Sequence, residues 1–271
     1  MVLQGYGKKT KKQKVNAFMD FEIKQIEKKG NSLKLLIKRT PTELINGLRR
    51  AVINQVPTLA IEEITIYENN SVIFDEMLAH RLALLPIKTD LKSYKKGEAT
   101  TFYIEKEGPC TVYSKDIKSK DPSIEIIGKK TPLVKLTKGQ KIKLEMKALL
   151  NSGKEHAKWQ PAVIGYRNVS AITVDKECDM CEECVKQCPR KILEAKGKKI
   201  VLTAAIECNA CKACVDSCEK GLLKIETIPN NFILFIETHG QLENDEILLK
   251  AIEALQEKVS EFKKSISSLK E

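Results

Sequence analysis

The sequence predicts an α+β protein, and three observations lead to that prediction. Two cysteine runs late in the chain indicate a small metal-cluster domain, and a long middle stretch consists of short strand-like segments. Two helical patterns lie outside these regions, one near the start and one at the end. At 271 residues the chain is too long for one small domain, so we expect two or three.

The first ordered segment is predicted to be a two-stranded ribbon over residues 21–39, with a turn at Gly30-Asn31. A helix is expected from Thr42, because Pro41 suits a first helical turn and Pro57 ends the pattern. The apolar residues of this helix recur at spacings of three or four and are Leu44, Ile45, Leu48, Val52 and Val56.

Residues 58–168 consist mainly of short segments with strand-like patterns, which predicts a β-rich domain. A short helix is expected over residues 76–85 and is ended by Pro86. Cys110 stands alone in a strand-like run, so we interpret it as a small core residue. The predicted strands are Ile61–Tyr67, Ser71–Phe74, Thr101–Glu105, Cys110–Tyr113 and Lys141–Met146.

The C-terminal segment carries a heptad pattern over three repeats, with Glu and Lys at most other positions. Such a narrow apolar seam can cover the chain's own sheet or pack on a helix of another chain, and its length and ionic flanks favour the second. Its residues, the heptad seam, are Leu248, Ile252, Leu255, Val259, Phe262, Ile266 and Leu269.

Eight of the nine cysteines form two copies of C-x2-C-x2-C-x3-C, offset by 30 residues. This is the spacing that holds two four-iron clusters in bacterial-type ferredoxins, where the last cysteine of each run binds the other cluster. We therefore predict two 4Fe-4S clusters. The first takes Cys178, Cys181, Cys184 and Cys218; the second takes Cys208, Cys211, Cys214 and Cys188.

Two other uses of these cysteines fit the pattern less well. Zinc favours two C-x2-4-C pairs separated by a longer spacer, which these unbroken runs do not match. A disulfide framework belongs to small secreted domains, and this long chain shows no apolar leader segment near its start. We therefore expect a reducing, cytoplasmic location. No run reaches the roughly 20 apolar residues of a membrane span.

The formal charge of +11 is concentrated partly in a lysine-rich start, which precedes the first acidic residue, Asp20. A basic run without interleaved aromatic residues is typical of a flexible, solvated end, so residues 1–18 are predicted to be a tail. Contact with nucleic acid is expected to be at most indirect. The lysines of this tail are Lys8, Lys9, Lys11, Lys12 and Lys14.

Three blocks resemble the D subunit of archaeal DNA-directed RNA polymerase, a family similar to the third-largest eukaryotic subunit and to the N-terminal region of the bacterial alpha subunit. The blocks are Thr42–Ala51, Phe74–Pro86 and Gly153–Pro161. The resemblance runs from about Asp20 to the C-terminus, and the cysteine insert makes it more specific.

The resemblance implies a discontinuous dimerisation domain, residues 19–57 and 228–271, that pairs with the small L subunit. A mixed β domain at 58–168 and a ferredoxin-like domain at 169–227 would be inserted into it. Small assembly subunits and the large catalytic subunits would be further partners. The implied interface residues are Leu44, Leu48, Val52, Leu248, Ile252, Leu255, Val259, Phe262 and Ile266.

Two functions are compatible with these features. One is a non-catalytic scaffold subunit that nucleates polymerase assembly, with structural or regulatory clusters. The other is a ferredoxin-type electron-transfer protein or redox-enzyme subunit. The absence of a G-x-G-x-x-G turn and the nearly 200 residues outside the cluster domain favour the scaffold. No catalytic residue is expected, because His80, His156 and His239 lie in unrelated contexts.

Overall fold

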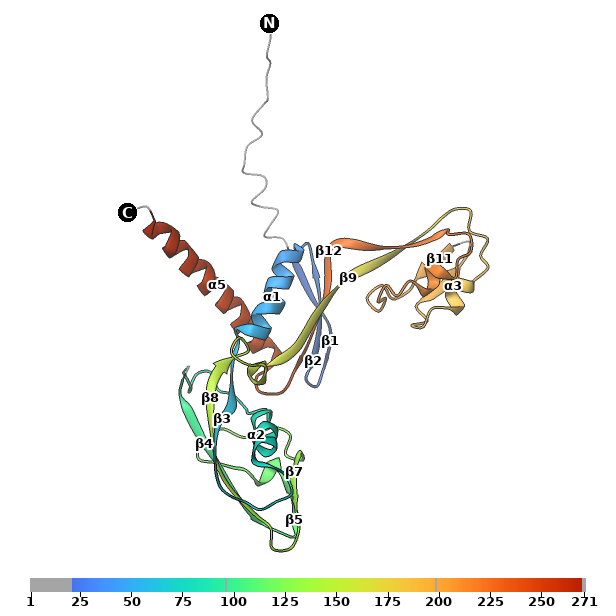
Figure 1. Cartoon of the computed structure of the whole chain (residues 1–271). Coiled ribbons are helices and arrows are strands. Elements are labelled where there is room, and N and C mark those ends of the chain that lie inside the picture. The colour runs from blue at the N-terminus through green and yellow to red at the C-terminus, as the bar shows by residue number, and fades with distance from the viewer. Residues whose placement is uncertain (1–20, 96, 198, 270–271) are drawn as a thin grey trace. The chain divides into compact units, whose positions relative to one another are not determined.

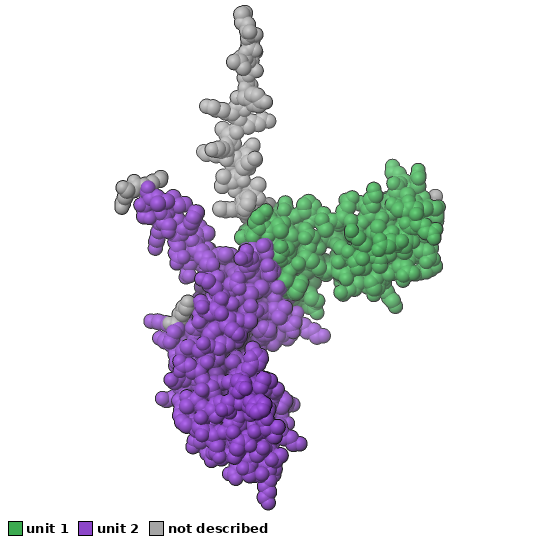
Figure 2. All heavy atoms as spheres, in the orientation of Figure 1, with its two compact units in different colours: residues 1–27, 34–45, 165–235 green, residues 28–33, 46–164, 236–271 purple. Residues whose placement is uncertain are grey.

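The computed structural model describes residues 21–95, 97–197 and 199–269 (Figure 1). The tail predicted for residues 1–18 lies outside the described residues. The chain divides into two compact units (Figure 2). Of the described residues, one unit holds those within 21–27, 34–45 and 165–235, and the other holds those within 28–33, 46–164 and 236–269. The domain boundaries given above stay predictions.

The β-rich region contains a four-stranded sheet of order β3-β8-β4-β6 and a two-stranded sheet of β5 and β7. Its core joins the sheets to helix α2 through buried residues such as Leu82, Ile104 and Met146. The elements are β3 (Pro57–Asn69), α2 (Asp75–Ala83), β4 (Ala99–Glu107), β5 (Cys110–Tyr113), the 3-10 turn η2 (Ser114–Asp116), β6 (Lys118–Ser119), β7 (Pro132–Leu136), β8 (Lys141–Ser152) and the 3-10 turn η3 (Ala157–Trp159).

The block Gly153–Pro161 has a structural role at the end of β8. A Cβ at Gly153 would lie 2.0 Å from the Ile53 carbonyl oxygen, so the site accepts only glycine without a backbone shift. The Trp159 indole donates a 3.1 Å hydrogen bond to the Leu149 carbonyl oxygen, and its ring lies 4.5 Å from the Lys158 ammonium. These contacts fix the chain where β8 leads into β9.

A second four-stranded sheet has the order β1-β2-β12-β9, so strands from the start of the chain pair with strands that flank the cysteine runs. Tyr166 and Phe232 meet edge to face with ring centroids 5.6 Å apart. The elements are β1 (Glu22–Lys29), β2 (Ser32–Lys38), β9 (Ala162–Val174), β12 (Leu223–Thr238) and the helices α1 (Thr42–Asn54) and α5 (Asn244–Ser268).

Most predicted elements are confirmed, including the ribbon, both long helices and α2. The strand predicted for Ser71–Phe74 is wrong: the chain bends there instead. The Asn69 side chain explains the bend, because its amide donates to the Ile73 carbonyl oxygen at 2.9 Å and its oxygen accepts from the Ser71 backbone at 3.2 Å. This local network competes with strand pairing. Cys110 is half-buried against the β-rich core.

Candidate metal centres and an exposed helix face

The two cysteine runs fold as copies of one backbone motif. Each contains a one-turn helix, α3 (Glu183–Lys186) or α4 (Ala213–Asp216). Equivalent hydrogen bonds recur 30 residues apart: the amide of Cys188 donates to the Val185 carbonyl oxygen at 3.4 Å, and that of Cys218 donates to the Val215 carbonyl oxygen at 3.1 Å. The repeat seen in the sequence is therefore a repeat of structure. A hairpin of β10 (Leu193–Lys196) and β11 (Lys199–Leu202) lies between the runs.

In each run, the residues on both sides of the second cysteine, Cys181 or Cys211, are not glycine but have left-handed backbone conformations. In the first run Met180 and Glu182 have φ of 57° and 63°; in the second Ala210 and Lys212 have φ of 54° and 65°. Such a residue costs on the order of 1 kcal/mol, and strain of this kind gathers at functional sites. The repetition of the same strained pattern indicates that the tight loop around Cys181 and Cys211 is a requirement of both sites.

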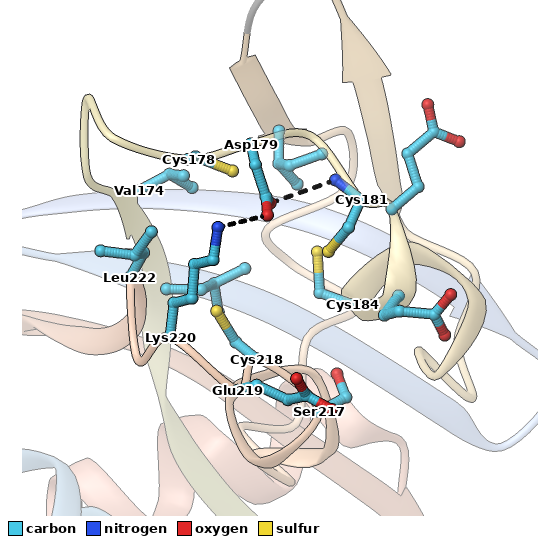
Figure 3. Close-up of a pocket in the computed structure, with 14 residues that line it drawn as sticks. Val174, Cys178, Asp179, Cys181, Cys184, Ser217, Cys218, Glu219, Lys220 and Leu222 are labelled. Carbon is cyan, nitrogen blue, oxygen red and sulfur yellow. Dashed lines mark hydrogen bonds and ion pairs between the residues drawn. The ribbon is translucent and has the colours of Figure 1, made fainter.

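One pocket collects four cysteines from both runs. Cys178, Cys181 and Cys184 come from the first run, and Cys218 comes from the end of the second (Figure 3). Their side chains line a cavity of about 190 Å³, and the apolar side of this cavity includes Val174, Ile200, Leu222 and Leu223. The grouping is the one predicted for the first cluster.

A second pocket has the complementary set. It is lined by Cys188 from the first run and by Cys208, Cys211 and Cys214 from the second. It is much narrower, about 10 Å³, so its lining must move outward to admit a group of the same size. The eight cysteines thus line two pockets, four in each, and the binding of clusters there stays a prediction.

A single metal ion and a four-iron cluster require different arrangements of donors. Among the described residues, no three His, Cys, Asp or Glu side chains converge closely enough to hold one metal ion. A four-iron cluster needs a different arrangement, because each of its four thiolates binds a separate iron. The sulfurs then stand around the cluster and do not meet at one point.

The innermost thiols resist ionisation. Burial raises the pKa of the Cys184 thiol, and the nearby Cys181 and Cys178 raise it further. Burial likewise raises the pKa of Cys214 to about 11. A buried thiolate needs compensating positive charge, which iron would supply when it replaces the proton.

Three charged side chains missed by the sequence analysis support the two sites. Lys220 and Asp179 form a 2.7 Å ion pair at the rim of the first pocket, joining the end of one run to the start of the other (Figure 3). The hydrogen bond from the Lys220 ammonium lowers the pKa of Asp179. Arg167, on β9, donates to the carbonyl oxygens of Ile206 and Cys208. No local sequence signal links Arg167 to cysteines some 40 residues away.

From Ile252 onward, α5 presents most of its apolar seam to solvent. Ile252 is 42% exposed, Val259 68% and Phe262 67%, and Ile266 is also exposed. The first part of the helix is held by the chain itself, since Ile247 and Ala251 are buried and Leu248 and Leu255 are half-buried. The chain therefore covers the start of the seam and leaves the rest uncovered.

Helix α1 divides in a similar way. Leu44 is 49% exposed and Leu48 is half-buried, so both are accessible to another chain. Val52 is a correction to the predicted interface: its exposed fraction is 0%, and it packs in the chain's own core. The spacing of Leu44, Leu48 and Val52 placed all three on one stripe, but the core covers the end of that stripe.

Comparison with known proteins gives consistent relatives. Residues 64–175 match the family model described as the RNA polymerase Rpb3/RpoA insert domain. The chain is 38% identical over 261 residues to DNA-directed RNA polymerase subunit Rpo3 of Archaeoglobus fulgidus, covering 92% of this chain and 98% of the relative.

Two further relatives carry the same name. Identity is 35% over 260 residues to Rpo3 of Methanosarcina mazei, with 90% and 97% of the two chains covered. It is 32% over 255 residues to Rpo3 of Pyrococcus furiosus, with 92% and 98% covered. In the described part of the chain, no helix is long and apolar enough to cross a membrane. Similarity of this extent, along nearly the whole length, shows that the chain belongs to the Rpo3 family of DNA-directed RNA polymerase subunits.

Proposed function

We propose that this chain is a non-catalytic scaffold subunit of DNA-dependent RNA polymerase that nucleates assembly in the cytoplasm by pairing with the L subunit. The observation that carries this proposal is the uncovered apolar seam on α5 of a chain that matches Rpo3 proteins over nearly its whole length. An exposed stripe of Ile, Val and Phe on a helix lowers the solubility of the protein unless another surface covers it.

The partner suited to this surface is a helix with its own apolar stripe. The heptad spacing from Ile252 to Ile266 fits knobs-into-holes packing, and the surrounding Glu and Lys residues can set orientation. The resemblance assigns Leu44 and Leu48 on α1 to the same partner, and both side chains are accessible. Burying these side chains would contribute about 1.5–3 kcal/mol for each one fully covered. The β-rich region, which matches the insert-domain family, would dock small assembly subunits and the large catalytic subunits.

The cysteine domain is proposed to hold two 4Fe-4S clusters with a mainly structural or regulatory role. Two four-cysteine pockets with the crosswise composition support this. The domain's own core also needs reinforcement, because half of its buried members are cysteines: Cys184, Cys188, Cys208 and Cys214, beside Ile192, Leu193, Ile200 and Leu223. A core this small rarely stabilises a domain without a staple.

The direct test is purification of the tagged full-length chain from its own cells without oxygen. We expect the L subunit and the large polymerase subunits to co-purify, and about eight irons with matching sulfide per chain, as two four-iron clusters require. Stoichiometric zinc without iron would refute the clusters. A chain recovered alone, or with redox enzymes only, would refute the scaffold.

Electron transfer is the second candidate, and one observation favours it. Cys181 and Cys211 are exposed, so a cluster in either pocket would lie near the surface, within reach of a redox partner. The same purification separates the two functions, because an electron-transfer protein would bring an oxidoreductase and a scaffold would bring polymerase.

A further inference from the structure

The two pockets are built on the same backbone but carry opposite charge. The first is lined by four carboxylates and one ammonium group, a net charge of −3, from Asp179, Glu182, Glu183, Glu219 and Lys220. The second is lined by no carboxylate, and its one charged side chain besides the cysteines is Arg190. The two copies of the repeat therefore share the same backbone geometry, but the charged side chains that line their pockets have opposite net charge.

The difference in charge is clearest in the loops around Cys181 and Cys211. Residues 30 apart occupy the same place, and the three positions that change charge or polarity are Asp179 against Asn209, Glu182 against Lys212, and Glu183 against Ala213. Glu182 and Lys212 even share the left-handed conformation, with φ of 63° and 65°. The loop of residues 179–183 carries a charge of −3 and the loop of 209–213 carries +1.

Neighbouring charges reduce this difference without removing it. Lys186 pairs with Glu183 at 2.6 Å, whereas its counterpart Asp216 adds a negative charge near the second site. Lys191, beside Arg190, offsets Asp216, and its counterpart Gly221 is uncharged. The surroundings of the first site thus stay negative and those of the second stay positive.

We infer that the two clusters are inequivalent redox centres, with the first site at the lower reduction potential and the second site reduced first. This inference rests on the proposed iron-sulfur content. Held by these cysteines, each cluster would take one electron from dithionite and pass from the 2+ to the 1+ state. No bond is made or broken and no proton is required.

The physical reason is that reduction adds negative charge to a cluster that already carries four thiolates. Nearby carboxylates disfavour that change, and ammonium or guanidinium groups favour it. The repeat matches ligand number, backbone conformation and the burial of the inner cysteines Cys184 and Cys214, which are 8% and 5% exposed. Net charge differs between the two sites in sign.

One difference acts in the opposite direction. Three of the four cysteines of the second pocket are buried, against one of the four in the first, and poorer solvation disfavours the more highly charged reduced state. The charged residues of the first site adjoin its ligands in sequence, well within a Debye length of about 8 Å, so salt screens them only in part. We therefore expect charge to outweigh burial.

The test is a potentiometric titration of the full-length chain, loaded with iron and sulfide and followed by EPR with dithionite as reductant. We expect two resolved one-electron steps, separated by at least tenfold in equilibrium constant, about 59 mV for a one-electron couple. Iron and sulfide are measured on the same sample. Absence of iron would refute the cluster proposal itself, whereas a full complement with coincident steps would refute only the inequivalence.

Exchanging the charged residues between the two cysteine loops shows which cluster is responsible for which reduction step. Asp179→Asn, Glu182→Lys and Glu183→Ala copy the second loop into the first and should raise the lower potential alone. Asn209→Asp, Lys212→Glu and Ala213→Glu make the reverse change and should lower the higher potential alone. These substitutions leave all eight cysteines in place.

A control changes charge on the same domain at a residue that lines neither pocket. Glu194→Gln, on β10, removes an exposed carboxylate that pairs with Lys196 and lines neither pocket. It should leave both potentials in place. If the first set of substitutions leaves the lower step unmoved, or if the lower step responds to the second set, the assignment of potentials to sites is wrong.

Discussion

Individual backbone conformations show how much the cysteine loops constrain single residues. Met180, Glu182, Ala210 and Lys212 all have positive φ, although none is glycine. Each loses stability in this conformation because its Cβ crowds the following carbonyl oxygen. The loops keep the conformation because the turn must place three cysteines of one run around the same pocket.

Replacing Ala210 by glycine should therefore stabilise the domain. Glycine adopts φ of +54° without steric cost, so we expect Ala210→Gly to add up to about 1 kcal/mol to the unfolding free energy and to slow cluster loss to a chelator. Ala195→Gly, in strand β10, is the control and should destabilise by about 0.5–1 kcal/mol. Equal destabilisation by both substitutions would show that the left-handed conformation at Ala210 is not strained.

A second residue, Asp116, links the stability of the β-rich region to pH. Burial alone would raise its pKa, but hydrogen bonds from the Tyr113 amide at 2.8 Å and the Lys106 ammonium at 2.9 Å outweigh burial, and the pKa is lowered. The stabilising contribution is complete above the unfolded pKa, about 3.9, and is lost as pH falls through the lower folded value. Asp116→Asn should lower the melting temperature by a few degrees at pH 7 and flatten its dependence on pH below about 4. If Asp116→Asn leaves the fall in melting temperature below about pH 4 unchanged, other carboxylates cause that fall.

At the scale of elements, the long helix α5 changes character along its length. Its first turns are anchored by Ile247 and Ala251, which are buried, and by the Lys28–Asp245 ion pair at 3.1 Å. From Ile252 onward most of its seam is exposed. The anchored part fixes the direction of the helix, and the exposed part is free to pack on a partner.

Two carboxylates on the seam should abolish pairing with the L subunit. Leu255→Asp combined with Phe262→Asp would bury charge without a partner in the heterodimer, at a cost of several kcal/mol. Phe262 is 67% exposed in the chain alone, so its replacement should leave the fold and the cluster absorption intact. Co-elution of the tagged chain and the L subunit on size exclusion measures the result.

The control keeps the spacing and moves the charges to another face of the helix. Ser260→Asp with Ser267→Asp changes two exposed, uncharged residues seven apart, as the seam variant does. This control should still bind the L subunit. Retention of that partner by the seam variant would place the interface elsewhere.

The elements found from sequence are those with an uninterrupted pattern. The helices α1 and α5 and the ribbon keep one period throughout, whereas β12 does not. This 16-residue strand contains Pro229-Asn230-Asn231, which looks like a turn, and Asn230 adopts φ of 60° without ending the strand. Asparagine tolerates that conformation, so the strand continues through it. Pairing with distant β2 and β9 stabilises the continuation, and that pairing has no local sequence signal.

At the scale of the whole molecule, the cysteine pockets combine what the sequence could predict with what it could not. Spacing predicts the ligand sets, because the crosswise rule follows from the two ferredoxin-type runs. The fold supplies Arg167 from β9 and the pairing of Lys220 with Asp179, which depend on contacts between residues about 40 apart. The same reasoning explains Val52: periodicity predicts a stripe, but the rest of the fold decides where the stripe is covered.

Loss of one ligand from each cluster separates structural clusters from working redox centres. Cys184→Ser with Cys214→Ser removes one buried ligand from each proposed cluster, and metal-binding free energy in a domain with so small a core is folding free energy. We expect a loosened domain and a lower yield of assembled polymerase, most of all in air.

Pairing with the L subunit should survive this double substitution, because the α5 seam lies outside the cysteine domain. Polymerase that does assemble should have near-normal specific transcription activity, because nucleotide addition transfers no electrons. Parent and variant complexes are purified side by side, and yield and specific activity are measured separately. Normal assembly with a collapse in specific activity would refute a structural role and favour a redox or regulatory one. Lower yield with unchanged turnover is the result that the small core and the two buried thiols lead us to expect.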